Sequence, residues 1–171
     1  MRGFMLIALA SVTVFAALLL WAAACDLASM EIPNRISIIM AGIYPFMALI
    51  CHLSLAQIGL HLATGAGALV LCYILFSIGV FGGGDAKVLA AAAVWTGPAV
   101  FLPFLLCTAI AGGVLTAGIA GARAALRPAD SRPSYMNRLL QPGGGIPYAI
   151  AIAAGGLGVL WHLPIWQHGA G

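Results

Sequence analysis

The stretch Phe81-Gly82-Gly83-Gly84-Asp85-Ala86-Lys87 separates two long apolar runs and contains one of only four acidic residues in the chain. Of the 171 residues, 63% are hydrophobic and 6% are charged, whereas soluble globular proteins are about 45–50% apolar and about 25% charged. A carboxylate at membrane depth costs about 2.5–3.5 kcal/mol on insertion scales, so Asp85 is a functional-site candidate. The three glycines carry no Cβ, which permits unusual backbone torsions and lets an extended peptide approach.

The composition predicts an all-α membrane protein that forms a single domain over residues 1–171. We expect six transmembrane segments, at residues 4–24, 36–51, 58–80, 86–96, 99–121 and 146–163. The fourth ends at Gly97-Pro98 and, at about 11 residues, is too short to cross a bilayer without tilt or partners. A cleaved signal peptide is the rival interpretation of the first segment.

Basic residues predict the orientation of these segments. If the segments alternate sides, one side holds Arg35, Lys87, Arg123, Arg127, Arg132 and Arg138, and the other holds only Arg2. An excess of Lys and Arg marks the cytoplasmic side, so we expect both termini outside and Asp85 at the cytoplasmic face. The polar segment 122–145 has two interpretations. Its charged residues either set the topology and contact anionic lipid, or the segment forms a cover near the site.

Asp26 follows the first apolar run, and the same charge bias places it at the same face as Asp85. Two carboxylates within hydrogen-bond reach cannot both ionise cheaply, so near neutral pH one holds a proton. Such a pair supplies a general base that activates water and a general acid that protonates a leaving amine. Two simpler roles stay open: Asp85 as a helix N-cap and Asp26 as a cap or interface charge.

The remaining polar residues have less specific interpretations. Lys87 could bind a charged group of a lipid or of the substrate. It could instead be a lysine at the membrane interface whose aliphatic stem lies along apolar surface. Asn34, after Pro33, could brace the start of the second segment or contact a substrate. The four cysteines and four histidines lie scattered without metal-ligand spacing, so we expect no metal and no cofactor. We also expect no nucleic-acid partner, and the oligomeric state is open.

Three elements, in this order, resemble the type IV prepilin peptidases, which are membrane aspartic peptidases of the GxGD kind. Five residues separate Asp26 from Ile32-Pro33-Asn34, as in that family's first motif. Gly82-Gly83-Gly84-Asp85-Ala86-Lys87 matches the second motif, and Gly145-Ile146-Pro147-Tyr148 is similar to the element that opens the family's last segment. The resemblance implies catalytic roles for Asp26 and Asp85. It implies supporting or substrate-binding roles for Gly82, Gly83, Gly84, Lys87, Pro33 and Asn34.

The resemblance further implies a substrate. It is a pilin precursor whose positively charged leader is cut off at the cytoplasmic face of the bacterial inner membrane, just before an apolar helix. Many family members carry a cytoplasmic domain with paired Cys-x-x-Cys motifs after the first segment and also methylate the new N-terminus. Here that connection is about ten residues long and has no such pair. We therefore expect a peptidase without the zinc module and without N-methyltransferase activity.

The short form resembles the enzymes of tight-adherence (Flp-type) pili, and the archaeal preflagellin peptidases share its plan. Two functions of other classes stay open on the residues alone. One is a small proton-coupled carrier or channel that uses the same two aspartates. The other is a non-catalytic scaffold protein of a secretion apparatus.

Overall fold

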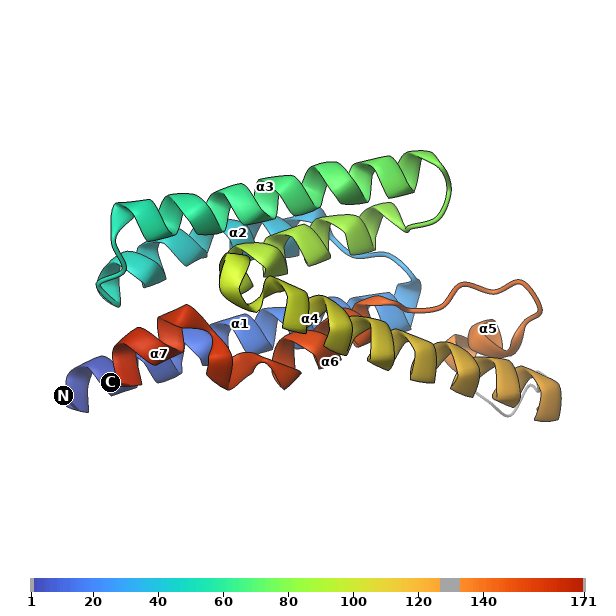
Figure 1. Ribbon diagram of the computed structural model, residues 1–171. Helices are drawn as coiled ribbons and strands as arrows, with labels where there is room; N and C mark the ends of the chain where they lie inside the picture. The colour runs from blue at the N-terminus through green and yellow to red at the C-terminus, as the bar shows by residue number, and fades with distance from the viewer. Residues whose placement is uncertain (1, 127–132, 171) are drawn as a thin grey trace.

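The structure is a computed structural model that describes residues 2–126 and 133–170, and the regular structure within them is helical. The expected all-α class is therefore confirmed. The elements are α1 (Arg2–Ser29), α2 (Asn34–Ile50), α3 (Leu55–Ser77), α4 (Gly83–Ala125), α5 (Ser134–Leu140), α6 (Ala149–Gly158), η1 (Leu160–His162) and α7 (Pro164–Ala170). Figure 1 shows the longer helices side by side, with both termini at one end of the molecule.

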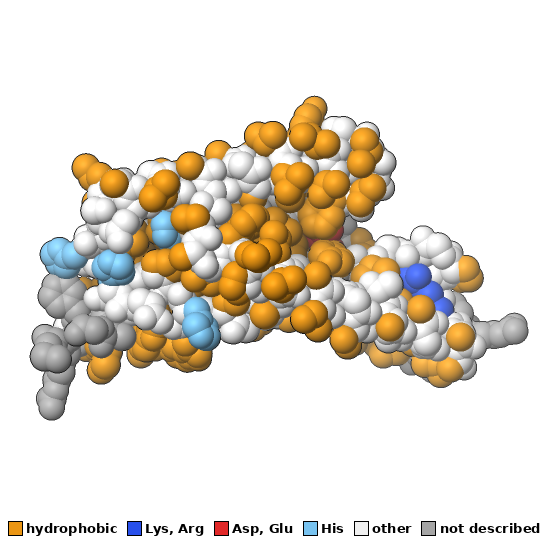
Figure 2. Space-filling model, viewed as in Figure 1, with side chains coloured by type: hydrophobic (Ala, Val, Ile, Leu, Met, Phe, Trp, Pro, Cys, Tyr) orange, Lys and Arg blue, Asp and Glu red, His pale blue; other side chains and the backbone are white. Residues whose placement is uncertain are grey.

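Large apolar side chains cover much of the outer surface (Figure 2). The most exposed include Ile38, Ile110 and Val114, each 69% accessible. Soluble monomers rarely expose broad apolar surface, whereas lipid-facing helices require it. Among the described residues, three helices are long and apolar enough to cross a membrane: Met5–Ser29, Leu55–Ser77 and Gly83–Ala125. The chain is therefore an integral membrane protein, and its six-segment topology and orientation stay predictions.

Helix α4 combines the segments expected at 86–96 and 99–121, and it is broken between them. Gly97 has φ 59° and ψ −179°, a non-helical conformation that is essentially reserved for glycine. Pro98, next in sequence, has no backbone N–H to continue the helical hydrogen bonds. Figure 1 shows α4 doubling back at this point. The first half of α4, Gly83 to Thr96, thus enters the protein, and the second half leaves it again.

The first half of α4 is the centre of the core. Every residue from Val88 to Gly97 is buried, and α2, α3 and α6 pack against α4. Four of these residues, Ala90 to Ala93, are alanines. Small side chains let neighbouring helices approach closely, and this contact drives association inside a membrane. The shortest expected segment is therefore the one that the others surround.

An aromatic cluster fixes this half-helix near the break. The indole N–H of Trp95 donates to the Met40 carbonyl of α2 at 2.8 Å. The Trp95 ring stacks on Phe15 of α1 with centroids 5.0 Å apart, and it meets Tyr44 edge-on at 5.4 Å. From α3, His61 Nδ1 donates to the Val94 carbonyl at 2.8 Å. Four helices are therefore joined at the end of the half-helix that is opposite Asp85.

Several boundaries differ from those expected. Helix α1 continues to Ser29, so Asp26 lies in its last turns and not in a polar connection. The helix stops because Met30 takes a left-handed conformation with φ 57°. Helix α6 begins at Ala149 instead of residue 146, and the segment 122–145 includes α5. Arg127, Asp130 and Arg132 of that segment lie outside the described residues.

Replacing Gly97 by Ala should destabilise the protein. An L-residue is strained at φ 59°, and an added Cβ would run into the His61 ring. We expect a loss of about 1–3 kcal/mol in the free energy of unfolding, measured by denaturant titration in detergent micelles. Gly113→Ala is the control, because nothing lies within 4 Å of a Cβ added there. Equal stability of the two variants would contradict the proposed strain.

Candidate active site

A cavity of about 390 Å³ brings the two aspartates together. Its lining comes from the end of α1, the connection to α2 and the start of α4, which are distant in sequence. The lining residues are Asp26, Met30, Glu31, Ile32, Asn34, Gly82, Gly83, Gly84, Asp85 and Lys87. Every residue that the sequence suggested for the site is among them except Pro33, which directly precedes α2. The structure thus places the residues in one cavity, while their catalytic roles stay predictions.

Asp26 is 6% exposed, and a hydrogen bond holds its carboxylate. Its Oδ2 accepts from the backbone N–H of Ala149 at 3.0 Å. Ala149 is the first residue of α6, where backbone N–H groups have no partner within the helix. A carboxylate at a helix N-terminus is also favoured by the helix dipole. Asp26 therefore caps α6, and the preceding Gly145-Ile146-Pro147-Tyr148 brings this N–H to it.

Asp85 is the third residue of α4 and is half-buried. The alternative N-cap role that was left open for Asp85 is excluded, because Gly82 occupies the N-cap position and makes no side-chain capping hydrogen bond. Asp85 Oδ1 is buried and has no hydrogen-bond partner among the described residues. A buried polar atom without a partner costs about 1–3 kcal/mol, and most buried polar groups in proteins are paired.

The three glycines of the GxGD stretch serve close packing. None of them has a positive φ, so the unusual torsions that glycine permits are not adopted here. A Cβ on Gly82 would lie 2.7 Å from the Asp85 carboxylate, and one on Gly83 would lie 3.2 Å from the Phe76 ring. A Cβ on Gly84 would contact Ile32 at 3.4 Å. Gly82 therefore leaves the space that the Asp85 carboxylate occupies.

Lys87 and Asn34 connect the starts of two helices. Lys87 Nζ donates to Asn34 Oδ1 at 2.9 Å, and both residues are exposed. Asn34 is the first residue of α2, directly after the N-cap residue Pro33. Of the roles suggested for Asn34, the structure shows a brace between α2 and α4. Sequence reasoning suggested both residues but did not pair them.

Two arginines place the described part of the basic segment beside the site. Arg123 donates to the carbonyls of Leu139 and Gly144, both at 2.7 Å. Arg138 Nη1 donates to the Ala28 carbonyl at 3.1 Å, in the helical turn that carries Asp26. None of the described residues of this segment lines the cavity, and both interpretations of the segment stay predictions. Arg138 was noted in the sequence for its charge alone, and its contact with α1 was not expected.

Comparison with known proteins identifies a family. The sequence profile of the type IV leader peptidase family matches residues 13–117. The matched region holds both aspartates and the whole cavity lining, and it ends before Ala149. No curated protein and no solved structure matches the chain significantly.

Removing the Asp26 side chain should destabilise the protein more than neutralising it. Asp26→Asn retains an oxygen that can accept from Ala149, whereas Asp26→Ala leaves that N–H without its partner. Both variants remove the same charge, so their difference isolates the hydrogen bond. We expect Asp26→Ala to be less stable by about 1–3 kcal/mol in thermal unfolding in micelles. Equal melting temperatures would show that the bond to α6 contributes nothing.

Proposed function

The chain belongs to the type IV leader peptidase family, and on that premise we propose that it cleaves prepilin precursors as an aspartic endopeptidase. One observation carries the catalytic part: Asp26 and Asp85, from different helices, line one cavity. A pair of carboxylates in one site provides an acid and a base together. No residue outside this pair is needed for the proton transfers.

The two aspartates have different surroundings, which suggests how they divide the work. Among the described residues, a backbone N–H donates to Asp26 and none to Asp85, and such a bond favours a negative charge on its acceptor. We therefore assign the charge to Asp26 and the shared proton to Asp85 before the reaction. Asp26 takes a proton from water as the water oxygen attacks the scissile carbonyl. The protonated partner then gives its proton to the leaving amine as the peptide bond breaks.

We further propose that cleavage occurs at the cytoplasmic face of the bacterial inner membrane. The cavity lies where α1 ends and α4 begins, and Figure 1 shows these helix ends far from both termini, toward the side of the molecule that holds α5. The basic residues of the sequence are biased toward the same end, and such a bias marks the cytoplasmic side. The site would therefore meet the leader of a precursor whose apolar segment is already in the bilayer.

The proposed substrate subtype is an Flp-type prepilin, and the proposed reaction stops at cleavage. Only residues 30–33 separate α1 from α2, a connection too short for an added domain. The connection contains no cysteine, so it offers no ligands of the kind that hold a structural zinc. We therefore propose that the new N-terminus is released without methylation.

Asp26→Asn and Asp85→Asn should each abolish precursor processing. General acid–base groups typically contribute about 10²–10⁴-fold in rate, so each variant should fall by at least the lower figure. The assay is co-expression with candidate precursors, followed by mass spectrometry of the pilin N-terminus, which reports the cleavage position and any methyl group together.

Each variant must accumulate in membranes to the level of the unmodified chain for this comparison to hold. Undiminished cleavage in either Asn variant would refute the paired-carboxylate mechanism. Proton or solute flux in proteoliposomes, without cleavage of any precursor, would instead support the carrier.

A further inference from the structure

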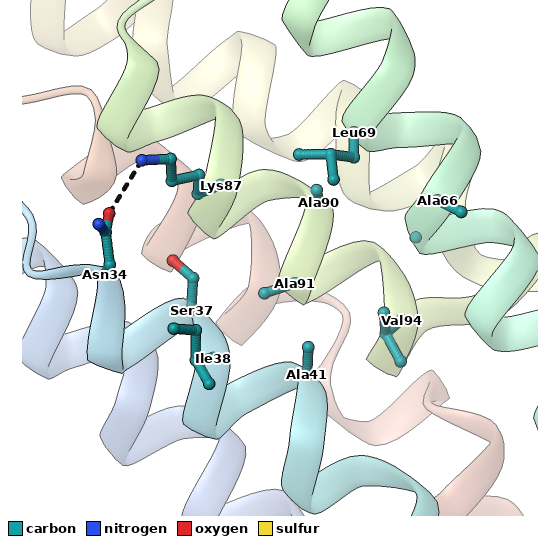
Figure 3. A pocket seen from close by; sticks show the side chains of 11 residues that line it. Asn34, Ser37, Ile38, Ala41, Ala66, Leu69, Lys87, Ala90, Ala91 and Val94 are labelled. Carbon is teal, nitrogen blue, oxygen red and sulfur yellow. Dashed lines mark hydrogen bonds between the residues drawn. The ribbon is translucent and has the colours of Figure 1, made fainter.

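A second cavity, of about 460 Å³, lies between α2 and α3, and the first half of α4 also lines it. Figure 3 shows its lining side chains. They are Asn34, Ser37, Ile38 and Ala41 of α2, Gly65, Ala66 and Leu69 of α3, and Lys87, Ala90, Ala91 and Val94 of α4. We refer to this cavity as the α2–α3 groove. Neither the family match nor the paired aspartates assigns it a role.

The α2–α3 groove has a floor of small residues and apolar sides. Gly65, Ala90 and Ala91 are buried in the floor, whereas Ile38 and Leu69 at the sides are 69% and 47% exposed. Within membranes, small residues allow a second helix to approach backbone to backbone. The shape therefore suits an apolar helix lying against α4.

The groove adjoins the cavity that holds the aspartates. Asn34 and Lys87 line both spaces, and the hydrogen bond between them marks the boundary (Figure 3). Three polar residues line the groove: Asn34 and Ser37 near the start of α2, and Lys87 near the start of α4. Farther along α4 the lining is apolar as far as Val94. A peptide segment bound in the groove therefore contacts apolar lining residues along most of its length, and polar groups only beside the carboxylates.

We propose that the α2–α3 groove seats the apolar membrane segment of the substrate, immediately after the scissile bond. The inference rests on the proposed peptidase function, because the position of the aspartates determines which end of the groove lies nearest the scissile bond. Between Lys87 and Val94 the groove follows α4 for about 10 Å, which is about two helical turns. The first two turns after the cleavage point therefore lie against α4, and small side chains on their inner face fit the alanine floor. The rival occupant is a lipid acyl chain.

The first test fills the groove. Ala66 is exposed on α3 and borders the groove, so Ala66→Leu narrows it without crowding the core. Ala63→Leu is the matched control, because Ala63 is also exposed on α3 and does not line the groove. The substrate is the precursor that the unmodified chain cleaves in the co-expression assay, presented in reconstituted vesicles. We expect Ala66→Leu to lower kcat/KM about tenfold or more and the control to change it less than about twofold.

The second test locates the substrate directly. A photoreactive side chain replaces Ala66 or Ala63 in the Asp85→Asn background, which retains the uncleaved precursor. We expect residue 66 to crosslink to the first turns of the precursor's apolar segment, identified by mass spectrometry, and residue 63 not to do so. Crosslinks from residue 66 to lipid alone, or equal crosslinks from both positions, would overturn the proposal.

The outcomes distinguish a failure of the groove inference from a failure of the proposed function. If the unmodified chain cleaves a precursor and Ala66→Leu cleaves it equally well, the groove inference fails and the peptidase stands. If the unmodified chain cleaves no precursor, the proposed function fails and the inference falls with it. Melting temperatures of both Leu variants in micelles should match that of the unmodified chain, since both positions are exposed.

Discussion

The break at Gly97 is the constraint on which the rest of the structure depends. A membrane interior offers no water to backbone N–H and C=O groups, so a chain that turns there must be enclosed by protein. Here Gly97 is buried beside the His61 ring, and the rings and hydrogen bonds of Trp95, His61 and Tyr44 join α2, α3 and α4. This arrangement allows a short helix to end inside the protein. The other end of that helix carries Asp85, and its position follows from the anchored core.

Sequence reasoning singled out most of the residues that line the cavity holding the two aspartates. Apolar runs interrupted by Gly97-Pro98 and by the glycines before Asp85 indicated where the helices break, because these residues act locally. Because the chain has few charged residues, Asp26 and Asp85 could be identified as candidate functional residues. The hydrogen bond from Ala149 to Asp26 could not be found this way, because the two residues are 123 positions apart and only the packed fold brings them together. The extension of α1 past Asp26 was likewise missed, since the polar residues that follow suggested a loop.

The glycines show a different limit of sequence reasoning. Three consecutive glycines suggested backbone freedom, yet their conformations are ordinary. What makes small residues necessary is the space taken by neighbours such as the Asp85 carboxylate and the Phe76 ring. Such neighbours come partly from another helix, so the pattern alone could not distinguish torsion from packing. The α2–α3 groove was missed for the same reason, since its alanines in α4 look like ordinary helix residues.

The α2–α3 groove also bears on how a substrate would arrive. Its flanking residues Ile38 and Leu69 face outward, so the groove opens toward the surrounding lipid. A precursor already anchored in the bilayer would then enter sideways, by diffusion in two dimensions. Confinement to a thin layer raises the local concentration of a tethered partner far above its average in the cell. Encounter frequency would accordingly follow the number of precursors per unit area of membrane, and weak affinity for each one would suffice.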